Sequence, residues 1–258
     1  RSREPVTVVS DGRHVRATLR EAGDEALLLA AHAPGVPVLV GRDRGVVGLR
    51  AIAGFGADVL VLDDGMQHHR LARDVEIVCF DGAGLGNGRV VPRGPLREPA
   101  AALRGADAIL VVDGPMPAAD EARVRAAAPQ AVWFAARRRP VSLRPLAGGP
   151  GAPAAVLRGR SVGMLAGIAR PANLRRTLES LGAEVAAERV FADHHRYRAR
   201  DVAGLAGPPL WVTTEKDAAK ILPRWTAPAD VRVLAIALEV DEPAALLDWL
   251  ERTLRKAW

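Results

Sequence analysis

The sequence predicts an α/β protein in which short buried strands alternate with helices. Hydrophobic residues make up 49% of the 258 residues, which is enough for one large core or two modest cores. Short apolar runs typical of buried strands alternate along the chain with segments that have helical periodicity. Glycine and proline clusters separate these segments, as expected for turns and loops.

The first half of the chain is predicted to contain repeated strand–helix units. The apolar runs at 57–62 (ADVLVL) and 75–80 (VEIVCF) are typical of buried parallel strands. The other expected strands are 37–40, 108–113 and 132–135, and the expected helices are 24–31, 42–55 and 118–127.

A segment rich in proline and glycine, residues 139–153, separates the two halves. We therefore expect a first domain at 1–135, a linker at 136–156 and a second domain at 157–258, with the two domains facing one cleft. In the second domain we expect strands at 161–167, 211–214 and 231–238, and helices at 173–181 and 243–256. The last helix places leucines 246, 247, 250 and 254 on one face.

The composition narrows the possible partners. The formal charge of +6 is compatible with an anionic partner such as a nucleotide, a phosphorylated glycolipid or an anionic membrane, but equally with a solvated arginine-rich surface. Nucleic acid is not favoured, because aromatic residues are only 4% and no recognition motif is present. Cys79 is the single cysteine, which excludes an intrachain disulfide and fits a reducing compartment.

The segment 63–69 (DDGMQHH) directly follows one of the predicted strands. Ligands of α/β sheets bind at the carboxyl ends of strands, so Asp63 and Asp64 are candidates for holding Mg²⁺ on a nucleotide phosphate. Gln67 and His68 add polar groups to the same loop. A strand-end turn in which one acid caps the next segment is the alternative explanation for either carboxylate.

A glycine-rich loop at 82–88 (GAGLGNG) follows the next strand. It has Asn87 where a dinucleotide-binding motif would have its last glycine, and it lacks Gly-Lys-Ser/Thr. Arg93 and Arg97, just beyond it, are suited to gripping phosphate, and Glu98 could reach a metal or form a salt bridge with one of these arginines.

These motifs together resemble the tetraacyldisaccharide 4′-kinase family, the lipid A 4′-kinases of Gram-negative bacteria. The similarity is carried by DDGxQH at 63–68, RDxEIV at 73–78, GNG at 86–88 and GPLREP at 94–99. It continues through GDEALL at 23–28, AGIARP at 166–171, FADHHRY at 191–197 and TEKDA at 214–218, and so covers nearly the whole chain.

The resemblance implies a fold and a reaction. The fold would be a P-loop-kinase-like three-layer sandwich with a second, smaller α/β domain. The reaction would transfer the γ-phosphate of ATP, with Mg²⁺, to the 4′-hydroxyl of tetraacyldisaccharide 1-phosphate at the cytoplasmic face of the inner membrane. Asp63, Asp64 and Glu98 would bind the metal. The substrate-binding residues would be Gln67, His68, Asn87, Arg93 and Arg97.

The resemblance also implies a catalytic pair formed by Asp24 and a histidine of the 193–195 segment (DHH), for which we favour His194 over His195. Such a pair could accept the proton of a sugar hydroxyl that attacks the γ-phosphate. From the residues alone, Asp24 would be an ordinary acid in the first turn of a helix. The segment 213–217 (TTEKD) is explained by helix capping, and we assign it no catalytic role.

One feature departs from the family pattern, because the sequence contains no Gly-Lys-Ser/Thr phosphate loop. We interpret the chain as an N-terminally truncated piece of the kinase and expect it to be a very poor kinase by itself. Two alternatives stay open. One is a metal-dependent phosphohydrolase that uses the Asp and His residues of 63–69 and 193–195. The other is a non-catalytic fragment that binds lipid.

Overall fold

The computed structural model describes residues 5–257 and divides into two compact units, each discontinuous in sequence. Unit 1 contains the chain as far as Val61 together with Pro140–Ile236, and unit 2 contains Leu62–Arg139 together with Ala237–Trp258. The chain passes from one unit to the other after Val61 and again within two long strands, β5 (Val132–Pro145) and β10 (Asp230–Val240). The division into domains at residues 135 and 157 stays a prediction.

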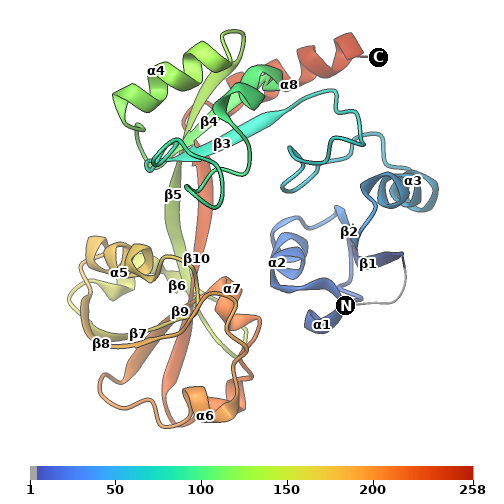
Figure 1. Cartoon of the computed structure of the whole chain (residues 1–258). Coiled ribbons are helices and arrows are strands. Elements are labelled where there is room, and N and C mark those ends of the chain that lie inside the picture. Colours follow the sequence, from blue (N-terminus) through green and yellow to red (C-terminus); the bar gives the residue numbers. More distant parts are fainter. Residues whose placement is uncertain (1–4, 258) are drawn as a thin grey trace. The chain divides into compact units, whose positions relative to one another are not determined.

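The C-terminal part of unit 1 is a parallel sheet with strand order β10-β9-β7-β8 (Figure 1). Its strands besides β10 are β7 (Ser161–Ala166), β8 (Glu184–Val190) and β9 (Leu210–Thr214). Alternate residues of β7 face opposite sides, so Val162 and Met164 pack with helix α5 (Pro171–Ser180), whereas Leu165 packs with Trp211. Gly163 is required there, because a Cβ would lie 2.3 Å from the indole of Trp211.

The N-terminal part of unit 1 contains an antiparallel pair, β1 (Val6–Asp11) and β2 (Pro37–Gly41), with three helices. These helices are α1 (Leu19–Ala22), α2 (Asp24–His32) and α3 (Arg44–Phe55). Helix α3 begins where the Asp43 carboxylate accepts two backbone N–H groups and ends at Gly56 in the left-handed conformation. Helix α2 packs against the short helix α7 (Glu215–Ala218), which brings residues almost two hundred positions apart into contact.

Unit 2 is built on three parallel strands in the order β3-β4-β5, where β3 is Ile77–Asp81 and β4 is Ala108–Val112. The helices of this unit are α4 (Ala118–Ala127) and α8 (Pro243–Ala257), shown at the top of Figure 1. The buried side chains of Leu85, Leu103, Ile109 and Val124 form its main core, and the ring of Trp249 lies 5.7 Å from that of Phe134.

Short elements complete the chain. They are η1 (Ala100–Gly105), β6 (Ala152–Pro153), η2 (Ala154–Leu157), α6 (Ala199–Val202) and η3 (Pro223–Trp225). Strand β6 pairs antiparallel with β5, so part of the predicted linker belongs to sheet structure.

The predicted strand at 57–62 is wrong, because these residues have no regular secondary structure. Val61 is 93% exposed and Val59 is 54% exposed, so the run is not buried either. A parallel strand needs hydrogen-bonding neighbours on the sheet, and no described strand pairs with this segment. The strand at 37–40 exists, but it belongs to an antiparallel pair rather than to a parallel strand–helix repeat.

Candidate active site

The first group of functional side chains lies at the start of helix α2. Asp24 is the first helical residue, preceded by Gly23 with a positive φ of 88°. Its side chain is only 14% exposed, and its Oδ2 lies 3.5 Å from Nδ1 of His194 and 3.4 Å from Nζ of Lys220. The aspartate and the histidine that the sequence predicts as a pair are therefore brought together.

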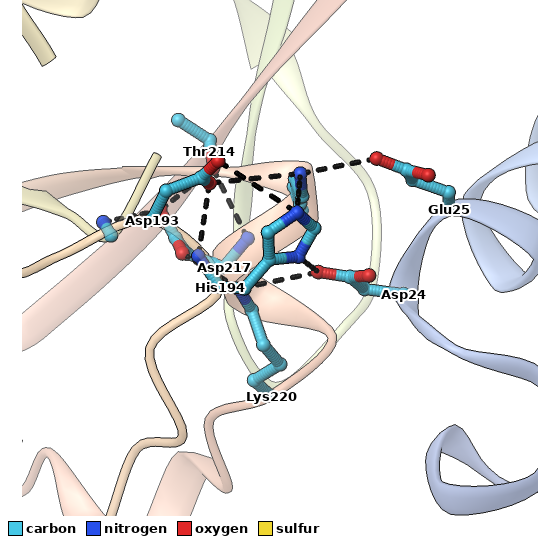
Figure 2. A network of polar contacts seen from close by, with 9 residues as sticks. Asp24, Glu25, Asp193, His194, Thr214, Asp217 and Lys220 are labelled. Atoms are coloured by element: carbon cyan, nitrogen blue, oxygen red, sulfur yellow. Dashed lines mark hydrogen bonds and ion pairs between the residues drawn. The ribbon is translucent and has the colours of Figure 1, made fainter. Parts of the chain in front are cut away.

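His194 is directed by an unusual backbone conformation. Its φ of 57° lies in the left-handed region, which non-glycine residues rarely adopt, and its N–H donates to the Asp193 carboxylate at 2.9 Å. The ring reaches Asp24 through Nδ1, and its Nε2 lies 3.4 Å from Nζ of Lys216. Figure 2 shows the imidazole of His194 with Asp24 on one side and Asp193 on the other.

Asp217 supports the pair from within the protein. Its side chain is fully buried and accepts hydrogen bonds from the Gly167 N–H at 2.9 Å and from the Thr214 hydroxyl at 3.0 Å. Nζ of Lys220 lies 3.2 Å from its other oxygen, without a well-aligned hydrogen bond, so the attraction there is mainly between charges. Lys220 thus connects a buried carboxylate to Asp24, as Figure 2 shows.

The electrostatics of this cluster favour an ionised Asp24. Partial burial by itself would raise the pKa of Asp24, but the positive charges of Lys220 and Lys216, together with hydrogen bonds, outweigh that effect. The pKa therefore lies below the ordinary value of 3.8. At neutral pH the carboxylate carries its charge and can accept a proton in the course of a reaction.

Lys216 and Lys220 are the residues of this site that sequence reasoning missed. A signal was present, because the chain has 36 Lys and Arg residues of which only three are lysines, and two of these are four positions apart after a strand. The sequence predicts a helix cap in the segment 213–217, and Thr214 does cap α7 by accepting the Asp217 N–H. The cap explains the local structure but not the lysines.

His195 has different surroundings from its neighbour. Its ring stacks on Phe191 at 4.3 Å between centroids, and its Nε2 lies 3.1 Å from the Asp201 carboxylate. His194 has a side chain 56% exposed and contacts Asp24, whereas that of His195 is 27% exposed and contacts none of the α2 residues in the described structure. Of the two histidines, His194 is thus the one that contacts Asp24, and its catalytic role stays a prediction.

The second group of predicted residues lies in unit 2, in the segments 63–69 and 82–98. Asp64, with φ of 53°, forms an ion pair with Arg97 at 2.6 Å, and Arg97 also donates to the side-chain oxygen of Gln67 at 3.2 Å. Glu98 is joined to His69 at 2.8 Å and to the Gln67 amide nitrogen at 3.5 Å. The two motifs that the sequence singles out are thus in direct contact.

Asp63 and His68 differ from their neighbours in this group. The Asp63 side chain makes no hydrogen bond or ion pair with any residue that the structure describes, and His68 contributes backbone hydrogen bonds to Gly65 and Arg73. Among residues 5–257, no group of three or more His, Cys, Asp or Glu side chains is arranged to hold a metal ion. The predicted metal set is therefore not a preformed cage, and its role stays a prediction.

Asn87 fixes the conformation of the glycine-rich loop. Its side-chain nitrogen donates to the Arg93 carbonyl at 2.8 Å, and its oxygen accepts the Arg89 N–H at 3.0 Å. A Cβ on Gly94 would lie 2.1 Å from this oxygen, so the GPLREP motif needs glycine at that position. The predicted contact of Asn87 and Arg93 with substrate is not tested by this arrangement.

The parallel strands and helices of the two units place the chain in the class of α/β proteins. More particularly, the chain belongs to the family of tetraacyldisaccharide-1-P 4′-kinases (LpxK), whose sequence model matches residues 1–255. The resemblance inferred from the motifs is confirmed.

Individual relatives agree with this family. The chain is 46% identical over 253 residues to a tetraacyldisaccharide 4′-kinase of Anaeromyxobacter sp. (strain Fw109-5), covering 93% of this chain and 67% of the relative. It is 41% identical over 241 residues to one of Syntrophus aciditrophicus, covering 86% and 64%. The chain thus spans about two thirds of the length of the curated relatives it matches.

A solved structure supports the fold. The crystal structure of LpxK from Aquifex aeolicus described as the "apo" form in complex with ATP matches with a TM-score of 0.76 and 27% identity, covering 98% of this chain and 76% of that one. The expected P-loop-kinase-like α/β fold is confirmed by this match. None of the helices within residues 5–257 is both long enough and apolar enough to cross a bilayer.

Proposed function

We propose that the chain carries the hydroxyl-activating part of a lipid A 4′-kinase, which transfers the γ-phosphate of ATP to the 4′-hydroxyl of tetraacyldisaccharide 1-phosphate. The observation that carries this proposal is the ionised Asp24 carboxylate held beside His194, in a chain of the tetraacyldisaccharide 4′-kinase family. Such a pair has the chemistry needed to remove a proton from a sugar hydroxyl.

In the proposed reaction, the 4′-hydroxyl donates its proton to the Asp24–His194 pair while its oxygen forms a bond to the γ-phosphorus. The bond between the γ-phosphorus and the bridging oxygen breaks, and ADP leaves with the electron pair. Lys220, which is itself paired with the buried Asp217, holds the Asp24 carboxylate in place. Holding the base in position before the substrate arrives lowers the cost of reaching the transition state.

The segments 63–69 and 82–98 are proposed to bind the nucleotide and its Mg²⁺. The residues fit this metal, because Asp63, Asp64 and Glu98 offer oxygen ligands and Asp63 has no partner among the described residues. Mg²⁺ commonly uses one or two carboxylates with phosphates and water, so a preformed group of three is not needed. When bound, the ion would neutralise charge on the β- and γ-phosphates.

The arginines of the same loop are proposed to bind phosphate oxygens. Arg97 already binds a carboxylate, because its Nη1 donates to both oxygens of Asp64, and a guanidinium that pairs with a carboxylate can pair with a phosphate as well. Gln67 would be released from Arg97 and Glu98 to contact the ligand, with His68, Asn87 and Arg93 completing the site. Because the proposed substrate is acylated, the protein is proposed to contact the cytoplasmic face of the inner membrane peripherally.

A phosphoryl-transfer assay with ATP, Mg²⁺ and tetraacyldisaccharide 1-phosphate tests this proposal. It should be run on this chain and on the product of the complete reading frame that contains it. In whichever protein is active, Asp24→Asn and His194→Gln should each lower turnover by roughly 10²–10⁴-fold, with a much smaller effect on substrate binding.

His14→Gln is the matched control, because His14 is an exposed histidine of the same unit that contacts neither Asp24 nor His194 in the described structure. Equal loss in the control and the two site variants would contradict the assignment. Transfer that survives both site variants would favour a different base. Phosphate release from the lipid without ATP would favour the phosphohydrolase, and lipid binding without transfer by either protein would favour a non-catalytic fragment.

A further inference from the structure

Lys216 is placed to decide which nitrogen of His194 carries the proton. Its Nζ lies 3.4 Å from Nε2 of the ring, and its side chain is 21% exposed. The ammonium is held there by two carboxylates, Glu25 at 3.2 Å and Asp193 at 3.8 Å. A lysine ammonium has three donors and no acceptor, so the contact is attractive only if Nε2 presents its lone pair.

The contact at the other ring nitrogen, Nδ1, indicates the same distribution of protons. Nδ1 faces Asp24, whose carboxylate is ionised at neutral pH and can only accept a hydrogen bond. Nδ1 must therefore carry the proton for this contact to be attractive. The two contacts, made to different elements of unit 1, select the same neutral tautomer.

The ring could also donate a hydrogen bond from both nitrogens, and Lys216 opposes that state. Asp193 lies 3.7 Å from Nε2, so a carboxylate, which can only accept a hydrogen bond, lies near each ring nitrogen. Lys216 places a positive charge next to Nε2 and shares the Asp193 carboxylate. The charged groups that face the ring are thus Asp24 from α2, Asp193 from its own loop and Lys216 from α7.

We propose that Lys216 is a positioning residue that holds His194 neutral, with the proton on Nδ1 and the lone pair of Nε2 directed to the lysine. The consequence for the reaction rests on the proposed function. A ring in this state offers no free lone pair to the substrate, so Lys216 acts through the histidine and not on the reacting hydroxyl group.

Ring nitrogen spectroscopy of the ¹⁵N-labelled chain at neutral pH tests this proposal without any enzymatic activity. The signals of His194 are assigned by their loss in His194→Gln. The unsubstituted chain should show a protonated Nδ1 and an unprotonated Nε2. In Lys216→Met the unprotonated Nε2 signal should be lost as the ring takes up a second proton, whereas Lys216→Arg, which keeps a charge and donors, should retain it.

An imidazolium, or a proton on Nε2 alone, in the unsubstituted chain would overturn the proposal, and so would an unchanged pattern in Lys216→Met. The first of these outcomes does not depend on whether the variant folds. The His195 ring, stacked on Phe191 and paired with Asp201, reports whether the loop keeps its structure in each variant. If the tautomer is as stated but Asp24→Asn transfers phosphate normally, the proposed function fails while this inference stands.

Discussion

The carboxylate clusters of the two units differ in how firmly each is anchored. In unit 1, Asp24 is 14% exposed and is connected through Lys220, 7% exposed, to the fully buried Asp217. In unit 2, the Asp64 and Arg97 side chains that pair with each other are 60% and 62% exposed. The unit 1 cluster is anchored to a buried carboxylate, and the unit 2 cluster is held by solvent-exposed side chains.

This difference indicates different tasks. A group that must accept a proton in a defined direction benefits from a rigid, partly desolvated environment, which raises the strength of each interaction. A group that must exchange its partner for a phosphate or a metal ion benefits from contacts that cost little to break. The unit 1 cluster fits the first description, and the Asp64–Arg97 and Glu98–His69 pairs fit the second.

Removing the buried anchor should give the largest effect on stability. We expect Asp217→Ala to lower the free energy of unfolding by roughly 3–5 kcal/mol, because it leaves Lys220 with one carboxylate fewer in a buried position and removes the acceptor of two hydrogen bonds. Urea unfolding followed by circular dichroism measures this value.

The double variant Asp217→Ala with Lys220→Met is the matched control for this prediction. It removes the buried charge together with its partner, so it should be more stable than Asp217→Ala alone. If the two variants are equally unstable, the loss comes from the hydrogen bonds to Gly167 and Thr214 rather than from the ion pair.

The pH dependence of Asp24 gives an intermediate effect. Its pKa is lowered in the folded protein, so the stabilisation is fully present above the unfolded value near 3.8 and is lost as pH falls through the folded value. The stability advantage of the unsubstituted chain over Asp24→Asn should be constant between pH 7 and about pH 5 and shrink in more acidic solution. An advantage that grew on acidification would mean that the pKa is raised.

The exposed pair of unit 2 should give the smallest effect. We expect Asp64→Ala to change the free energy of unfolding by less than about 1 kcal/mol, and the change should become smaller at high salt. The comparison of Asp217→Ala with Asp64→Ala at two salt concentrations measures the contrast between the clusters directly. A loss at Asp64 as large as that at Asp217 would show that the unit 2 loops are anchored as firmly as the unit 1 site.

Local patterns in the sequence determined much of what is observed. The helices at 118–127 and 243–257 and the strands at 108–112 and 210–214 follow from periodicity and apolar runs that each segment carries within itself. The motifs also led to the correct family, and to Asp24 and His194, which lie next to each other in unit 1. No such pattern links Asp24 to Lys216 or Lys220.

Tertiary structure alone decided the remaining points, since they depend on contacts between distant segments. Residues 57–62 are as apolar as a buried strand, yet they form none, because strand formation needs a hydrogen-bonding neighbour that a local pattern does not contain. The contacts of Lys216 with Glu25 and of Lys220 with Asp24 form only because α2 packs against α7. Charge interactions weaken with distance and are screened by salt beyond roughly 10 Å, and sequence separation does not predict which charges will come that close.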